Sequence, residues 1–233
     1  MSNEPKNTLL DLNIIHLTDI HGAVSCINKI EKELQNSDLV ILSGDISHFG
    51  KRKDVQQIIQ KLAVYNKHIY AVAGNCDYKE ADEYLTREGI NLNKRITAIR
   101  GFTLCGFGGS LPCPGPTPFE YKENEAKKWL KELEANITSS DPIVFVTHEP
   151  PYNTILDKLS DGRHVGSRSV RKFIEVMSPL LCLTGHIHEG EGIDKIGNCM
   201  LVNPGPFKTG KYASVRITGV SSVHVDLKQI TVH

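Results

Sequence analysis

Short apolar runs alternate with amphipathic stretches in the first part of the chain. The runs cover residues 12–17, 39–42 and 69–72, and each has the length of a buried strand. Between them, apolar residues recur every three or four positions over 27–34 and 55–62, which is the spacing of a helix that buries one face. Strands that alternate with helices predict parallel βαβ units and an α/β fold.

The middle of the chain has a different pattern. Apolar segments at 95–99 and 102–107 are separated by Gly101, which predicts a β-hairpin. Residues 108–118 are rich in Gly and Pro and predict a long surface loop, a kind of segment that is often functional. A charged amphipathic helix is expected over 119–133.

The last part of the chain returns to short runs and then becomes mainly strand-like. Apolar runs are expected to form strands at 143–146 and 180–183, with a helix over 168–177 between them. Residues 199–232 predict strands with a turn at 203–206. The length of 233 residues favours one domain over 1–233, in which residues 1–11 form a loose tail.

Composition excludes several classes of protein. Lys+Arg and Asp+Glu number 27 each, so no net charge attracts long nucleic acid or an anionic membrane. No apolar run approaches the length of a membrane span, and residues 1–7 lack the apolar stretch of a signal peptide. The six cysteines form no C-x-x-C pair, so we expect a reduced, cytoplasmic setting. A homo-oligomer is compatible with this composition.

Five of the apolar runs end in residues that can bind a metal ion. Such a residue, taken singly, more often forms a turn or a capped strand end. In open α/β sheets, however, ligands bind beyond the carboxyl ends of the strands, where several runs can contribute to one site. Oxygen and imidazole donors together suit Mn, Fe, Zn or Co. The candidate ligands are Asp19, His21, Asp45, Asn75, His148, His186 and His188.

The order of these motifs resembles the calcineurin-like metallophosphoesterase superfamily. The finer motifs resemble the Icc-related predicted phosphoesterases. The superfamily motifs are Asp-x-His at 19–21, Gly-Asp at 44–45, Gly-Asn-x-Asp at 74–77, a single His148 and Gly-His-x-His at 185–188. The finer motifs include His-Glu-Pro-Pro at 148–151, His-Val-Gly-Ser at 164–167 and Asn-Pro-Gly-Pro at 203–206.

The resemblance implies a fold, a cofactor and a reaction. The fold would be a four-layer α/β/β/α sandwich of two mixed β-sheets flanked by helices. Two divalent transition metal ions, with manganese favoured, would support hydrolysis of a small phosphate mono- or diester by a hydroxide that bridges them. One ion would be held by Asp19, His21 and His188, the other by Asn75, His148 and His186, and Asp45 would bridge the two.

Two positions concern proton transfer. Many members of the superfamily have a histidine where this chain has Cys76, and cysteine is a weaker hydrogen bonder. Protonation of a poor leaving group is therefore in doubt, although Cys76 is equally well explained as a small buried side chain. His164 lies in a Gly-flanked loop before a predicted helix and is the candidate replacement proton donor, so the expected catalytic residues are Asp45, Asn75 and His164.

Other functions stay open at this point. The resemblance extends to a protein-sorting subunit that acts as a scaffold, so a metal-binding scaffold or partner-binding module is the alternative hypothesis. The complete set of seven ligands favours the enzyme, because a scaffold has no physical need for them. A nuclease is disfavoured by the neutral charge and by the lack of a basic stretch interleaved with aromatic residues.

Overall fold

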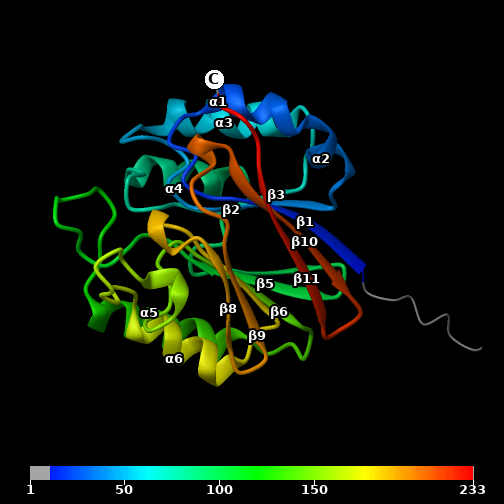
Figure 1. Ribbon diagram of the computed structural model, residues 1–233. Helices are drawn as coiled ribbons and strands as arrows, with labels where there is room; N and C mark the ends of the chain where they lie inside the picture. Colours follow the sequence, from blue (N-terminus) through cyan, green and yellow to red (C-terminus); the bar gives the residue numbers. More distant parts are fainter. Residues whose placement is uncertain (1–10, 233) are drawn as a thin grey trace, which may run out of the picture.

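Two β-sheets lie face to face between two layers of helices in the computed structural model, which describes residues 11–232 (Figure 1). The first sheet contains β1 (Asp11–Leu17), β2 (Leu39–Ser43), β3 (Ile69–Val72), β10 (Lys211–Thr218) and β11 (Ser222–Gln229). The second contains β4 (Ile96–Ile99), β5 (Phe102–Phe107), β6 (Ile143–Thr147), β7 (Leu181–Leu183), β8 (Gly192–Ile196) and β9 (Cys199–Asn203). Their orders are β11-β10-β1-β2-β3 and β4-β5-β6-β7-β9-β8.

The helices are divided between the two outer faces. The first sheet is covered by α1 (Val24–Ile27), α2 (Glu31–Asn36), α3 (Arg52–Ala63) and α4 (Lys79–Arg87). The second is covered by α5 (Glu123–Asn136) and α6 (Arg168–Met177). Short 3₁₀ turns complete the description: η1 (Asn28–Ile30), η2 (Ile155–Asp157), η3 (His188–Gly190) and η4 (Phe207–Thr209). The predicted four-layer α/β/β/α sandwich is therefore confirmed.

Both sheets are parallel in the middle and antiparallel at their edges. Strands β1, β2 and β3 run parallel, as do β5, β6, β7 and β9. The predicted hairpin forms from β4 and β5, and β10 pairs antiparallel with both β1 and β11. Parallel pairing brings the carboxyl ends of neighbouring strands to one edge of each sheet.

Alternate residues of the strands pack into different apolar layers. In β1, Ile14 lies in the layer between the two sheets, while Ile15 lies in the layer under the first helices. In β6, Val144 belongs to the middle layer and Phe145 packs toward α6, where its ring contacts Phe173. All residues of β2 and β6 are buried, which explains their continuous apolar sequence. These strands are thereby packed on both faces.

Some predicted boundaries differ from the structure. The helix expected from residue 119 begins at Glu123, because Phe119 and Tyr121 instead make backbone hydrogen bonds with Asn75 and Ser110. The helix expected over 27–34 is divided among α1, η1 and α2, and α4 and β8 were not predicted. Of the predicted tail, Asp11 belongs to β1, and residues 1–10 lie outside the described residues. The single-domain organisation stays a prediction.

Candidate metal centre

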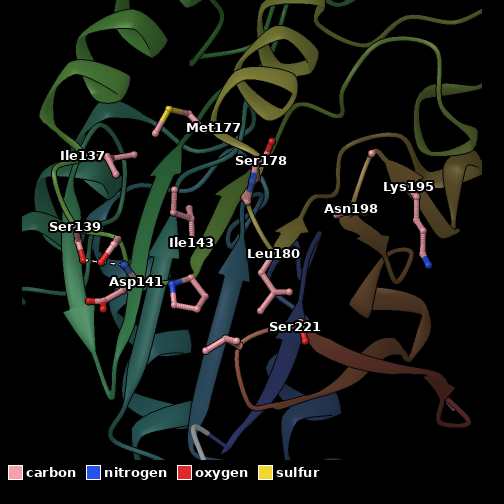
Figure 2. A pocket seen from close by; sticks show the side chains of 15 residues that line it. Ile137, Ser139, Asp141, Ile143, Met177, Ser178, Leu180, Lys195, Asn198 and Ser221 are labelled. Carbon is pink, nitrogen blue, oxygen red and sulfur yellow. Dashed lines mark hydrogen bonds between the residues drawn. The ribbon is translucent and has the colours of Figure 1, made fainter.

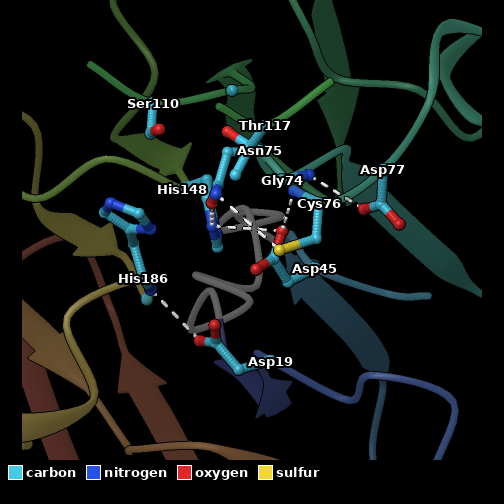
Figure 3. Close-up of polar contacts among 12 residues, drawn as sticks. Asp19, Asp45, Gly74, Asn75, Cys76, Asp77, Ser110, Thr117, His148 and His186 are labelled. Atoms are coloured by element: carbon cyan, nitrogen blue, oxygen red, sulfur yellow. Dashed lines mark hydrogen bonds and ion pairs between the residues drawn. The ribbon is translucent and has the colours of Figure 1, made fainter. Parts of the chain in front are cut away.

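The predicted ligands lie where the carboxyl ends of strands from both sheets meet. Figure 3 shows Asp19, Asp45, Asn75, His148 and His186 among them. They follow β1, β2 and β3 in the first sheet, and β6 and β7 in the second. Hydrogen bonds cross between the sheets at this point. The His186 backbone N–H donates to Asp19 Oδ2 at 3.1 Å, and the His148 ring donates to the Ser43 carbonyl at 2.7 Å. The site is therefore built jointly by the two halves of the sandwich.

The backbone at the site is strained. Asp19, His21, Asp45 and His186 have φ angles of 51°, 45°, 48° and 67°, in the left-handed region that non-glycine residues seldom adopt. Backbone hydrogen bonds hold this conformation: the Asp19 N–H donates to the Gly44 carbonyl at 3.1 Å and the His21 N–H donates to the Asp45 carbonyl at 2.9 Å. Strain of this kind is typical of functional sites, where it aims side chains that a regular strand would point apart.

Asp19, His21 and His188 form one group of potential ligands. Their nearest donor atoms all lie within 4.8 Å of one another. The Asp19 Oδ1 atom is 3.1 Å from His188 Nε2 and 3.7 Å from His21 Nε2, and Asp19 is buried. The structure thus brings together the three residues predicted to hold the first ion.

Asp45 lies between two histidines from opposite sides of the site. Its Oδ2 atom is 3.6 Å from His21 Nε2, and its Oδ1 atom is 3.4 Å from His148 Nε2. Burial opposes ionisation of this carboxyl, but the neighbouring His148 outweighs burial and lowers the pKa of Asp45. One carboxylate therefore presents a separate oxygen to each side of the site, as a bridging ligand must.

The surroundings of His148 indicate a cation site. Its Nδ1 atom lies 2.7 Å from the Ser43 carbonyl, which can only accept, so Nδ1 carries the hydrogen. Metal-binding histidines commonly donate their other ring N–H in this way. Nε2 then faces Asn75 Oδ1 at 2.9 Å and Asp45 Oδ1 at 3.4 Å, so three acceptor atoms converge. Burial lowers the pKa of His148, but Asp45 more than offsets this and raises it to about 10. Without an ion, Nε2 therefore carries a proton, and a metal ion would take the place of this proton among the three atoms.

His21 provides the clearest test of whether a metal fits. Both of its ring nitrogens are buried and have no hydrogen-bond partner among the described residues. Leaving buried polar atoms unpaired is costly. A metal ion on Nε2 would satisfy this nitrogen while also neutralising Asp19 and Asp45 beside it. The oxygen and nitrogen donors therefore fit divalent ions.

His186 lies beside the other ligands, with different nearest contacts. Its ring centroid is 5.0 Å from that of His148. Its Nε2 atom is 3.8 Å from Cys113 Sγ and 4.0 Å from Glu149 Oε2. Among the residues that the structure describes, the groups of three or more potential His, Cys, Asp or Glu ligands do not include His186. Its neighbours hold the ring at the edge of the site.

Asp77 and Gly74 shape the site and were not singled out from the sequence. The buried Asp77 carboxylate accepts hydrogen bonds from the backbone N–H groups of Ile46, Ser47 and Gly74, at 2.8 to 3.0 Å, and so joins the loops after β2 and β3. A Cβ atom at position 74 would lie 2.1 Å from Asp45 Oδ1. The Gly-Asn-x-Asp motif contained the signal for both residues.

The loop at 108–118 reaches the site. The Leu111 N–H donates to Glu149 Oε2 at 2.9 Å, and burial raises the pKa of Glu149 to about 8. Cys113, in the same loop, lies with its sulfur 3.8 Å from Asn75 Nδ2. The loop therefore forms one wall around Asn75 and His186.

His164 is paired with a carboxylate that sequence reasoning missed. Its Nδ1 atom lies 2.7 Å from Oδ1 of Asp157, which is fully buried, while the His164 side chain is 25% exposed. Asp157 also accepts the Gly166 N–H at 2.9 Å. The loop between Asp157 and His164 touches η3 through a hydrogen bond from Ser160 to Glu189, the residue after His188.

A separate pocket of about 920 Å³ lies away from these residues (Figure 2). It is lined by residues at the amino ends of β6 and β7, among them Ile143 and Leu180, and by the β10–β11 turn. None of the predicted ligands lines it. Across residues 11–232, no helix is both long and apolar enough to cross a membrane.

Comparisons with known proteins agree with the geometry. A family model described as calcineurin-like phosphoesterase matches residues 12–190. The uncharacterized protein MJ1162 of Methanocaldococcus jannaschii is 38% identical over 199 residues, which cover 84% of this chain and 88% of that protein.

Solved structures share the fold at low sequence identity. TT1561 of Thermus thermophilus has a TM-score of 0.67 at 19% identity, and the match covers 92% of this chain and 98% of that one. The phosphopantetheinyl hydrolase PptH from Mycobacterium tuberculosis has a TM-score of 0.58 at 13% identity, with 84% and 90% covered.

Proposed function

Because this chain belongs to the calcineurin-like phosphoesterase family, we propose that it hydrolyses a small phosphate mono- or diester at a centre of two divalent metal ions. The observation that carries the proposal is the position of Asp45, whose two oxygens face His21 on one side and His148 on the other. Members of this family hydrolyse phosphate esters. We propose in addition the metal ligands, the proton donor and the class of substrate.

We propose the ligand assignment that the resemblance implies, and the contacts of several of its side chains support it. The first ion is assigned to Asp19, His21 and His188, the second to Asn75, His148 and His186, with Asp45 between them. The ions are drawn from Mn, Fe, Zn and Co. When bound, they supply positive charge for the phosphoryl oxygens and lower the pKa of the attacking water.

The charge of the ligands suits an anionic substrate. Asp45 offsets the repulsion between two dications, and Asp19 adds the second negative charge of the set. Asn75 is neutral, so the ligands do not cancel the charge of the ions. The net positive charge that is left attracts a phosphate group to the site.

His164 is the residue we propose as the proton donor to the leaving oxygen. Its Nδ1–H donates to Asp157, which leaves Nε2 to hold and release the transferred proton. Cys76 is a poor candidate for this role, because burial and the nearby Asp45 raise its thiol pKa far above neutrality.

We expect purified protein to contain two transition metal ions per chain and to hydrolyse an activated aryl phosphate diester. Chelation should remove the ions and the activity together, and restoring Mn²⁺, Co²⁺ or Zn²⁺ should recover both. Metal analysis alongside the hydrolysis assay is the measurement. His224→Ala is a suitable control, because this exposed histidine contacts Asp226 on β11. The substitution should leave the metal content and the hydrolysis rate unchanged. Bound metal without turnover on any phosphate ester would favour the scaffold alternative.

We also expect aryl phosphodiesters to react faster than alkyl phosphodiesters. Aryl leaving groups depart without full protonation, and a Cys76 thiol cannot replace the histidine acid of other family members. Steady-state rates on a matched aryl and alkyl pair test this. Equal rates would mean that the proposed donor His164 fully replaces the histidine of other members, or that protonation of the leaving group does not limit the rate.

We also propose a cellular compartment, a domain organisation and a limit on the substrate class. We place it in a reducing compartment, the cytoplasm, because all six cysteines are free, four of them fully or almost fully buried. We propose one catalytic domain over residues 1–233. Long nucleic acid is not the expected substrate of a chain without net charge.

A further inference from the structure

The sulfur of Cys76 faces the group of proposed metal ligands. Its Sγ atom and the nearest donor atoms of His21 and Asp45 all lie within 4.8 Å of one another. Figure 3 shows the thiol beside the Asp45 carboxylate, on the side that faces the site. The Cys76 backbone N–H donates to Asp45 Oδ1 at 2.8 Å, which fixes this loop against the carboxylate. The thiol is thus positioned as a donor, and it is not a side chain filling the apolar core.

A second, independent feature of the same group indicates a ligand. His21 has a side chain that is 7% exposed, and neither ring nitrogen has a hydrogen-bond partner among residues 11–232. Its Nε2 atom lies 3.6 Å from Asp45 Oδ2, in the group to which the Cys76 sulfur belongs. An imidazole nitrogen, a carboxylate oxygen and a sulfur that converge in this way form a mixed donor set for one metal ion.

We propose that Cys76 binds the ion held by His21 and Asp45 through its sulfur, so that the centre prefers the thiophilic ions Zn²⁺ and Co²⁺ to Mn²⁺. The inference rests on the proposed two-metal function. When the ion binds, the S–H bond breaks, the proton passes to solvent water, and a sulfur–metal bond forms. No oxidant or reductant is needed.

The donor type decides the preference among the four candidate ions. Carboxylate and carbonyl oxygens suit Mn²⁺, whereas thiolate sulfur suits Zn²⁺, and affinities rise from Mn²⁺ through Co²⁺ in most sites. The sequence favours manganese because its seven predicted ligands offer only oxygen and nitrogen atoms. If the sulfur of Cys76 is added to these ligands, the expected metal preference of the site changes from Mn²⁺ to Zn²⁺ and Co²⁺.

Cys113 offers a matched comparison. Its sulfur is also close to the site, 3.8 Å from Asn75 Nδ2 and from His186 Nε2. However, among the described residues Cys113 belongs to none of the groups of three or more potential ligands. A serine at either position keeps the size of the side chain nearly unchanged and replaces sulfur by a harder oxygen, so the two variants differ only in which sulfur is lost.

The test is the absorption spectrum of the Co²⁺-loaded full-length protein. A cysteine sulfur bound to Co²⁺ gives a ligand-to-metal charge-transfer band in the near ultraviolet, whereas visible d–d bands report bound Co²⁺ whatever its ligands. We expect the charge-transfer band in the wild-type protein and in Cys113→Ser, and its loss in Cys76→Ser and Cys76→Ala, with d–d bands present in all four. Circular dichroism shows that each variant is folded.

Competition titrations provide the second readout. Cys76→Ser should weaken Zn²⁺ and Co²⁺ binding by at least the roughly 10–100-fold that losing an outer-shell partner costs. Mn²⁺ binding should change less. d–d bands without a charge-transfer band in the wild-type protein would overturn the role of Cys76 and leave the metal centre standing. Loss of the band in Cys113→Ser alone would assign the sulfur to Cys113, and failure to bind Co²⁺ at all would overturn the metal centre itself.

Discussion

Asp45→Asn is expected to lose both metal ions and to lower phosphoesterase turnover by at least roughly 10²–10³-fold, the usual cost of removing one electrostatic contact to a transition state. Asparagine has the shape of aspartate but no charge, and it offers only one acceptor oxygen. That oxygen can still accept the Cys76 N–H, which now donates to Asp45 at 2.8 Å, so the loop should keep its fold. The amide NH₂ group would then face one of the two histidines and could not bind an ion.

Metal content, turnover on an aryl diester and circular dichroism should be measured on the same preparation. Asp226→Asn is the matched control, because this carboxylate on β11 is exposed and pairs only with His224 among the described contacts. It should retain both ions and full turnover. An Asp45→Asn protein that does the same would show that the carboxylate does not bridge the ions, and the ligand assignment would have to be rebuilt.

His164→Ala should lower turnover by roughly 10²–10⁴-fold, the usual contribution of a positioned acid or base, while both metal ions stay bound. The loss should be greatest for alkyl diesters, whose leaving oxygen needs the proton, and smallest for the best aryl leaving groups. The physical basis is the Asp157 carboxylate, 2.7 Å from His164 Nδ1, which holds one tautomer and directs Nε2 away from itself. The comparison of rates across leaving groups is the measurement.

Asp157→Asn removes the negative charge beside His164 and keeps one acceptor oxygen in the loop. The Thr154 N–H donates to Oδ1 at 2.8 Å and the Gly166 N–H donates to Oδ2 at 2.9 Å, so the asparagine keeps only one of these two contacts. We expect a smaller loss of turnover than in His164→Ala, with the same dependence on the leaving group. A uniform loss for all substrates would return His164 to a purely structural role, whereas a lower thermal midpoint is expected in either case because one backbone contact is lost.

The place where the candidate ligands gather could be predicted because each of them follows a largely buried strand within a few residues. Asp45 and His148 follow strands whose every residue is buried, so the apolar run and its polar end are both visible in the sequence. Parallel pairing then brings these ends together without any further information. The fold class follows from the same alternation of strands and helices.

Features that depend on loops could not be predicted in the same way. The pairing of Asp157 with His164 joins residues in an irregular segment that has no periodicity. The helix expected from residue 119 begins only at Glu123, because the Phe119 N–H donates to the Asn75 carbonyl. This tertiary contact has no signature in the local sequence. The direction of the Cys76 thiol depends on the hydrogen bond between its N–H and Asp45, 31 positions earlier.

The joint origin of the site in both sheets has a consequence for folding. Asp19 and His188 are 169 positions apart, and their side chains meet only when the two sheets have packed together. An ion bound there has affinity for the folded chain and almost none for the unfolded one, so by mass action it adds about 2.7 kcal/mol of stability at a hundredfold excess over its dissociation constant. Under the proposed function, a bound ion would therefore hold the two sheets together, and the stability of the folded protein would depend on the supply of metal in its surroundings.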